Sequence, residues 1–204
     1  MLSNKQVRQH LLCSSCETRF SKNEDKIERL TRRNDSKQKI FEKLEYVPTE
    51  TGQLYKLEPE PAEHLAYFAT SVIWRAHAMR KSCELGPYGP KFQAFLLGQD
   101  EFPVDAALGL MIIEPNELGL DPRSWLTQPA TVRVDHFQIH GFIASGLVFR
   151  LLVGKRIPAI LRLGCLAKTV GPRDIHVRPW NECQDALGAV RLLAQTTPRG
   201  KLAR

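Results

Sequence analysis

The sequence predicts an α+β protein, and two patterns indicate this fold class. From Ala62 to Cys83, hydrophobic residues recur at spacings of three and four, which is typical of a buried helix. From Phe102 onward, apolar runs alternate with turn residues, which is typical of short strands. The polar segment ahead of them adds short helical patterns and a cysteine pair. We therefore divide the chain into a zinc-knuckle and helical segment (1–49), an α+β core domain (50–195) and a basic tail (196–204).

Composition is that of an ordinary globular protein. With 204 residues, of which 43% are hydrophobic, the chain is long enough to bury a core. No apolar run reaches the length of a bilayer span, and the first ten residues are too polar for a signal peptide. Five cysteines, an odd number, favour metal binding or reduced thiols over disulfides. We expect a soluble, cytoplasmic protein with no membrane partner.

The net charge of +7 is unevenly distributed. The segments 1–49, 50–149 and 150–204 carry net charges of +4, −5 and +8. Two basic ends around an acidic middle suit contact with polyanions such as nucleic acid. A solvated surface with a basic tail explains the same distribution, so both interpretations stay open.

The N-terminal segment contains a Cys-x-x-Cys pair, Cys13 and Cys16. This spacing lets two thiolates bind one tetrahedral metal from a tight turn. Ser21 and Glu24 form a capping-box pattern, which predicts a helix that begins directly after the pair. Helical spacing resumes at Ile40 and continues to Pro48. The segment from Ser21 to Pro48 is therefore expected to form either two short helices or one long exposed helix.

Zinc is the metal that the pair predicts, but structural zinc needs four ligands. None of the other candidates forms a second Cys-x-x-Cys; they are His10, Cys83, Cys165, His176 and Cys183. Either distant ligands or another chain complete the site, or the cysteines are a reduced pair that binds no metal.

The remaining elements follow in order. We expect extended chain around a Thr51-Gly52 turn, the buried helix, and a short helix over 91–97. Strands are predicted over 106–113, 131–139, 142–153 and 157–166, in an antiparallel sheet because the links are short. Asn181 is expected to cap a final helix. Within the buried helix, Trp74 is interpreted as packing and Arg75 as pairing with an acid such as Glu63 or Asp105.

A basic stripe is predicted on the first helix. Four basic residues share one helical face, namely Lys22, Lys26, Arg29 and Arg33. Such a stripe matches the phosphate backbone of nucleic acid, most simply DNA, without reading bases. A solvated helix face is the alternative.

Two histidines, His136 and His140, are weak catalytic candidates. On a strand they would share a face, and Asp135 could orient one imidazole. Histidines that are packed or hydrogen-bonded on a half-buried sheet are the simpler interpretation.

Two segments resemble a group of uncharacterised bacterial proteins related to HNH endonucleases: residues 11–24 (LLCSSCETRFSKNE) and 67–76 (YFATSVIWRA). The resemblance covers about residues 5–100 and implies a treble-clef zinc unit followed by a buried helix. Members of the group carry an upstream cysteine pair and a Ser-His-Ile-x-Pro element, whose histidine would be the general base beside a divalent metal. The sequence begins after that element, so we expect it to be N-terminally incomplete.

Glu17 stands where active HNH nucleases often have histidine. Its carboxylate suits Mg²⁺ or Mn²⁺, which makes it a third weak catalytic candidate, although a surface acid is the simpler interpretation. We therefore predict a nucleic-acid-binding protein with an incomplete HNH-like knuckle and no autonomous nuclease activity. The alternatives are an interaction module whose protein partner completes the metal site, and a metal-dependent HNH-type endonuclease.

Overall fold

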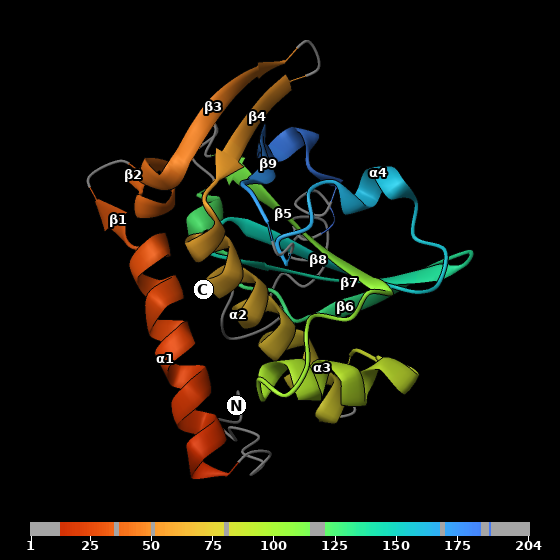
Figure 1. The fold of residues 1–204 in the computed structure, drawn as a ribbon. Helices are drawn as coiled ribbons and strands as arrows, with labels where there is room; N and C mark the ends of the chain where they lie inside the picture. Colours follow the sequence, from red (N-terminus) through yellow and green to blue (C-terminus); the bar gives the residue numbers. More distant parts are fainter. Residues whose placement is uncertain are drawn as a thin grey trace, which may run out of the picture.

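A seven-stranded mixed β-sheet with helices packed on it forms the centre of the molecule (Figure 1). The computed structural model describes residues 13–34, 37–49, 52–79, 82–114, 121–167, 170–184 and 188. The sheet has the strand order β3-β4-β9-β5-β8-β7-β6. The α+β fold class predicted from the sequence is confirmed.

The described helices and strands have these bounds. The α-helices are α1 (Ser14–Thr31), α2 (Pro59–Ala78), α3 (Gly89–Leu96) and α4 (Ala159–Arg162). Short 3-10 helices are η1 (Lys39–Lys43), η2 (Gly86–Tyr88), η3 (Pro122–Ser124) and η4 (Trp180–Glu182). The strands are β1 (Arg33–Asn34), β2 (Lys37–Gln38), β3 (Leu44–Thr49), β4 (Gly52–Leu57), β5 (Ala106–Glu114), β6 (Ala130–Val134), β7 (Phe137–Ala144), β8 (Leu147–Val153) and β9 (Arg173–Pro179).

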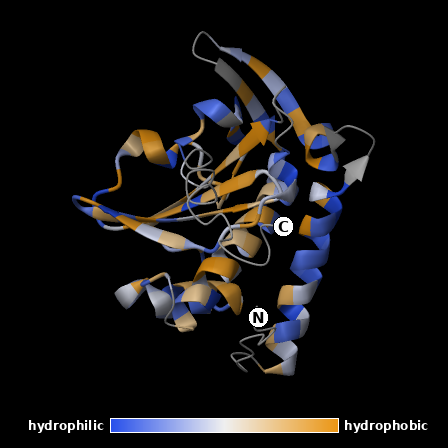
Figure 2. Ribbon diagram, turned by 180° about the vertical axis from the view of Figure 1, so that it is seen from behind, coloured by the Kyte–Doolittle hydropathy of each residue, from blue (hydrophilic) through white to orange (hydrophobic). Residues whose placement is uncertain are grey.

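Helix α2 is the buried central helix that its hydrophobic spacing predicts. Leu65, Ala69 and Ile73 on this helix are fully buried. The ring of Phe68 contacts Phe149 of β8 edge-on, with centroids 5.8 Å apart. This face of the sheet and the helices enclose the main core, whereas Figure 2 shows α1 as mostly hydrophilic along its length.

The sheet is mixed, whereas a wholly antiparallel sheet was predicted from the sequence. Strand β9 pairs antiparallel with β4 but parallel with β5. The predicted strand over 157–166 is wrong, because this stretch contains α4. Pro158 occupies the position before that helix, and Ile157 and Cys165 on either side of it pack with Ala107 of β5. The chain thus crosses over before returning as β9, which permits the parallel pairing.

The two strands predicted between 131 and 153 are three strands in the structure. Turns at Asp135-His136 and Ser145-Gly146 separate β6, β7 and β8, and Asp135, Ser145 and Gly146 have positive φ angles of 36°, 52° and 78°. The predicted break at residues 140–141 is wrong, because both residues lie inside β7, and the two turns fall within the predicted strands.

The first helix begins at Ser14 with Cys13 as its cap, eight residues before the cap predicted at Ser21. Phe20 and Ile27 lie seven residues apart and are both buried, so the face that packs on the protein already includes residues before Ser21. The helix ends at Thr31, and the second helical pattern is η1 followed by β3. Strands β3 and β4 pair as a hairpin, with Thr49 opposite Gly52. The predicted turn includes Thr51, which lies outside the described residues.

The predicted final helix falls mostly outside the described residues, as does the basic tail over 196–204. In the described part of the chain, no helix combines the length and apolar character needed to cross a membrane.

Candidate functional site

Helix α1 lies at the edge of the molecule, beside α2, and is attached by aromatic packing (Figure 1). Phe20 inserts between α1 and α2. Its ring meets Tyr67 and Trp74 edge-on, with centroid distances of 5.8 Å and 6.5 Å. Trp74 is only 8% exposed, so its predicted packing role is confirmed. Aromatic contacts of this kind fix the inner face of α1.

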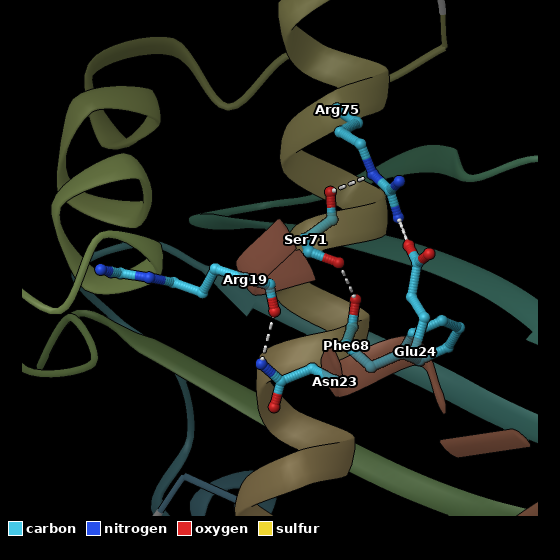
Figure 3. A network of polar contacts seen from close by, with 6 residues as sticks. All are labelled: Arg19, Asn23, Glu24, Phe68, Ser71 and Arg75. Atoms are coloured by element: carbon cyan, nitrogen blue, oxygen red, sulfur yellow. Dashed lines mark hydrogen bonds and ion pairs between the residues drawn. The ribbon is translucent and has the colours of Figure 1, made fainter. Parts of the chain in front are cut away.

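An ion pair attaches the middle of α1 to α2 as well. Glu24 accepts a hydrogen bond of 2.5 Å from Arg75 Nη2, and Arg75 Nε donates to the Ser71 carbonyl at 3.3 Å (Figure 3). The guanidinium also lies 5.6 Å from the Phe20 ring centroid. The acid partner is therefore neither Glu63 nor Asp105, the examples expected from the sequence.

A third contact fixes the N-terminal half of α1 to the end of α3. Arg19 Nη1 donates hydrogen bonds to the carbonyls of Leu96 and Leu97, and the Tyr67 hydroxyl donates to Leu96 at 2.9 Å. Asn23 donates to the Arg19 carbonyl one turn back, as Figure 3 shows. Of the basic side chains on α1, Arg19 is thus anchored to the end of α3 through Nη1, although it remains exposed.

The predicted basic stripe is present with three members. Lys22, Lys26 and Arg29 are exposed on α1, and none forms an ion pair with any residue that the structure describes. Arg33 does not extend the helical face, because α1 ends at Thr31 and Arg33 lies in β1. Arg32 is exposed but pairs with Glu28 at 2.8 Å.

The C-terminal half of the stripe borders a surface hollow of about 870 Å³. The hollow lies between α1, η1 and the start of α2, and its charged lining residues are Lys26, Arg29, Lys39, Lys43, Glu42, Glu58 and Glu60. His64 also lines it. Burial, followed by the Lys26 charge, lowers the pKa of this histidine from its ordinary value, so His64 adds no positive charge near neutral pH.

The cysteine pair lies at the start of α1 and not in a separate turn. Cys13 is the extended residue before the helix, and Cys16 lies in its first turn. Their Sγ atoms are 3.4 Å apart, and Cys13 Sγ lies 3.1 Å from the Ser15 hydroxyl. Hydrogen bonding, first from Ser15 and then from Cys16, lowers the pKa of the Cys13 thiol to about 7. The same sulfur contact raises the pKa of Cys16.

The structure does not gather the predicted zinc ligands. Among the described residues, no group of three or more His, Cys, Asp or Glu side chains could hold a metal ion. Cys83, Cys165 and Cys183 are buried in other parts of the fold, and His10 lies outside the described residues. Glu17 is exposed in the first turn of α1. Cys13 and Cys16 could therefore supply two sulfur ligands, and the residues needed to complete a zinc site are not beside them in the described part.

His136 and His140 do not form one site. His136 lies in the exposed turn between β6 and β7, so the expectation that both histidines share a strand face is wrong. His140 lies in β7 and is fully buried. Its Nδ1 is 2.8 Å from the Thr131 hydroxyl, and its Nε2 has no hydrogen-bond partner among the described residues. Burial, with a smaller effect of His77, lowers its pKa to about 4. Such a histidine is a neutral core residue that a substrate cannot reach.

A second hollow, of about 580 Å³, lies beside the His136 turn. Arg133, Lys155 and Arg156 line it together with the acids Glu84 and Asp135. Sequence reasoning missed this grouping because the two hairpin ends that supply the cations are far apart along the chain.

Comparison with known proteins gave no match: no protein-family model, curated protein or solved structure matches this chain.

Proposed function

We propose that this protein binds the phosphate backbone of nucleic acid, most simply DNA, through the outer face of α1. The observation that supports the proposal is the set of three exposed cations, Lys22, Lys26 and Arg29, which have no ion-pair partner among the described residues. Core packing does not account for them, because α1 is attached through its opposite, inner face.

The spacing of the three cations fits a polyanion. Lys22 and Arg29 are separated by seven residues, or about 10 Å along a helix, so one face presents three charges in a row. Because Phe20 and the Glu24–Arg75 pair fix the helix, contact with phosphates orders only the ends of the basic side chains. Contacts of this type position a protein on nucleic acid without selecting a sequence. A cytoplasmic location is part of the same proposal.

The test is the salt dependence of DNA affinity, measured by fluorescence anisotropy with a labelled duplex. Release of counterions from three phosphates gives a slope of log K against log salt of about −3. In the variant Lys22→Gln, Lys26→Gln, Arg29→Gln, we expect the slope to approach zero, since each lost contact removes about one unit.

A matched control removes three charges elsewhere. The variant Arg133→Gln, Lys155→Gln, Arg156→Gln has the same net charge but leaves α1 unchanged. We expect its slope to equal that of the wild type. Equal losses in the two triple variants would show that only net charge matters and would contradict the proposal.

A second candidate function is a protein-interaction module that completes a zinc site with a partner. The observation that favours it is the exposed Cys13 with a second sulfur 3.4 Å away, while the described residues offer no third ligand. This candidate predicts zinc that appears only with a co-purifying partner, and it predicts no salt-sensitive binding of DNA. The nuclease alternative, with Glu17 as a ligand, is tested by plasmid cleavage in Mg²⁺ or Mn²⁺.

A further inference from the structure

We propose that Cys13 and Cys16 form a redox-active dithiol that exchanges with an accessible disulfide, closing and opening a Cys13–Cys16 disulfide at the start of α1. This activity is independent of the basic stripe. It rests on the position, distance and exposure of the two sulfur atoms.

The two thiols are already close enough to pair. Their sulfur atoms are 3.4 Å apart, so a disulfide bond of about 2.05 Å needs an approach of only about 1.4 Å. Cys13 is the N-cap residue: its carbonyl accepts the first helical hydrogen bond from Glu17 N at 3.0 Å, but its own backbone is extended (φ −75°, ψ 162°) and its side chain is exposed. Rotation of the two side chains can close the bond without unwinding α1. Cys-x-x-Cys pairs at helix N-termini are known sites of thiol–disulfide chemistry.

Access separates this pair from the other cysteines. Cys13 is exposed and Cys16 is partly exposed. Cys83, Cys165 and Cys183 have 1%, 8% and 1% of their surface exposed. An oxidant from solution therefore reaches Cys13 first, and Cys16 is positioned behind it as the second thiol.

A small hollow beside the pair could bind the disulfide compound that reacts with Cys13. It measures about 190 Å³, and besides the two cysteines its lining residues are Phe20, Trp74, Gln93, Leu96 and Leu97. Arg19 holds the Leu96 and Leu97 carbonyls, so this wall is fixed relative to α1. The mostly apolar lining suits the hydrocarbon part of a disulfide compound, with Gln93 offering one polar contact.

The exchange conserves atoms and electrons in two steps. The Cys13 thiolate attacks one sulfur of a disulfide R–S–S–R′, the S–S bond breaks, and R–S⁻ leaves and takes a proton from water. The Cys16 thiol loses its proton to water and attacks Cys13 Sγ in the mixed disulfide, releasing R′–S⁻, which is protonated in turn. The cysteine pair is oxidised by two electrons and the external disulfide is reduced to two thiols.

The test is a redox titration of the full chain with reduced and oxidised glutathione. Thiols are blocked with N-ethylmaleimide, and tryptic peptides are measured by mass spectrometry. The peptide of residues 9–19 contains both cysteines of the pair and none of the other three. We expect one reversible transition to a peptide two hydrogens lighter, without blocking groups. In Cys16→Ser, Cys13 should instead retain a glutathione, whereas in Cys13→Ser little glutathione should be retained.

Variants and a metal assay give the controls. Cys83→Ser and Cys165→Ser should leave the transition unchanged, since their thiols are buried. Zinc per chain is measured on the same sample. A pair that stays reduced at every glutathione ratio, or that forms only disulfides between two chains, would overturn the proposal. So would about one zinc per chain that is lost in Cys13→Ser and that prevents oxidation, because the pair would then be a metal site.

Discussion

The Glu24 carboxylate and the Arg75 guanidinium meet at 2.5 Å across the contact between α1 and α2. The pair lies on the inner side of α1, next to Phe20, whose ring Arg75 also covers. Helix α1 is otherwise hydrophilic, with only Phe20 and Ile27 buried. The ion pair therefore supports the rotation of this polar helix that burial of Phe20 and Ile27 sets, and with it which side chains face outward.

We predict that this pair contributes a measurable coupling energy. Both side chains are partly exposed (40% for Glu24 and 32% for Arg75), so solvent screening limits the coupling to about 1 kcal/mol or less. A double-mutant cycle of Glu24→Gln and Arg75→Gln, measured by urea unfolding, isolates this energy. We expect it to decrease in 1 M salt. Additive single variants would show that the two groups do not interact.

The central helix α2 and strand β5 could be predicted from the sequence because buried hydrophobic residues recur along the whole length of each element. The early start of α1 was missed because only two residues of that helix are buried. A capping-box pattern at Ser21 then outweighed the weak hydrophobic signal of Phe20. For strand β9 the sequence indicated a strand surface at His176, between Ile175 and Val177, but not the bounds of the strand. Its alternating residues Asp174, His176 and Arg178 are not hydrophobic, although the strand lies inside the sheet.

We predict that basic residues on α1 and at its C-cap differ in their effect on DNA binding according to their ion pairs. Arg32 pairs with Glu28, whereas Lys26 has no ion-pair partner among the described residues. Lys26→Gln should therefore lower the salt slope by about one unit, and Arg32→Gln by less. Anisotropy titrations of the single variants at several salt concentrations measure both slopes. A larger loss in Arg32→Gln would place the binding face elsewhere on α1.

We predict that the fluorescence of Trp74 reports the redox state of the cysteine pair. Trp74 lines the same small hollow as Cys13 and Cys16, and disulfides quench nearby tryptophan emission. Emission should fall on oxidation with excess oxidised glutathione and recover with dithiothreitol. Trp74→Phe should abolish the change, and so should Cys13→Ser. A response that survives Trp74→Phe would come from another tryptophan and not from this hollow.

Only those parts of the candidate site that depend on residues close together in the sequence could be predicted. Lys22, Lys26 and Arg29 are placed on one face by helical periodicity alone, and this part was predicted correctly. The attachment of α1 to α2 depends on the contact between Glu24 and Arg75, which are 51 positions apart in the sequence. No local pattern contains that contact. For the two histidines, the spacing is visible in the sequence, but the turn at Asp135, which separates an exposed His136 from a buried His140, is not.

We predict that protonation of His140 destabilises the fold in acid. Its pKa is about 4 in the folded protein, against 6.5 for an ordinary histidine. Between these values the unfolded chain binds a proton at His140 and the folded chain does not. The free energy of unfolding is therefore unaffected by His140 above about pH 6.5, and it falls by up to about 3 kcal/mol as the pH decreases towards 4.

Urea unfolding at pH 7 and pH 4.5 measures this loss. In His140→Gln the difference between the two pH values should be smaller than in the wild type, although the variant has lower stability at pH 7. Among the described residues, Thr131 provides the hydrogen bond to the imidazole, so Thr131→Val tests whether losing that hydrogen bond alone has the same effect. We expect it to leave the pH dependence in place, since burial is the main cause of the shift. NMR of the ring gives a direct check, because a titration of His140 near pH 6.5 in the folded protein would contradict its burial.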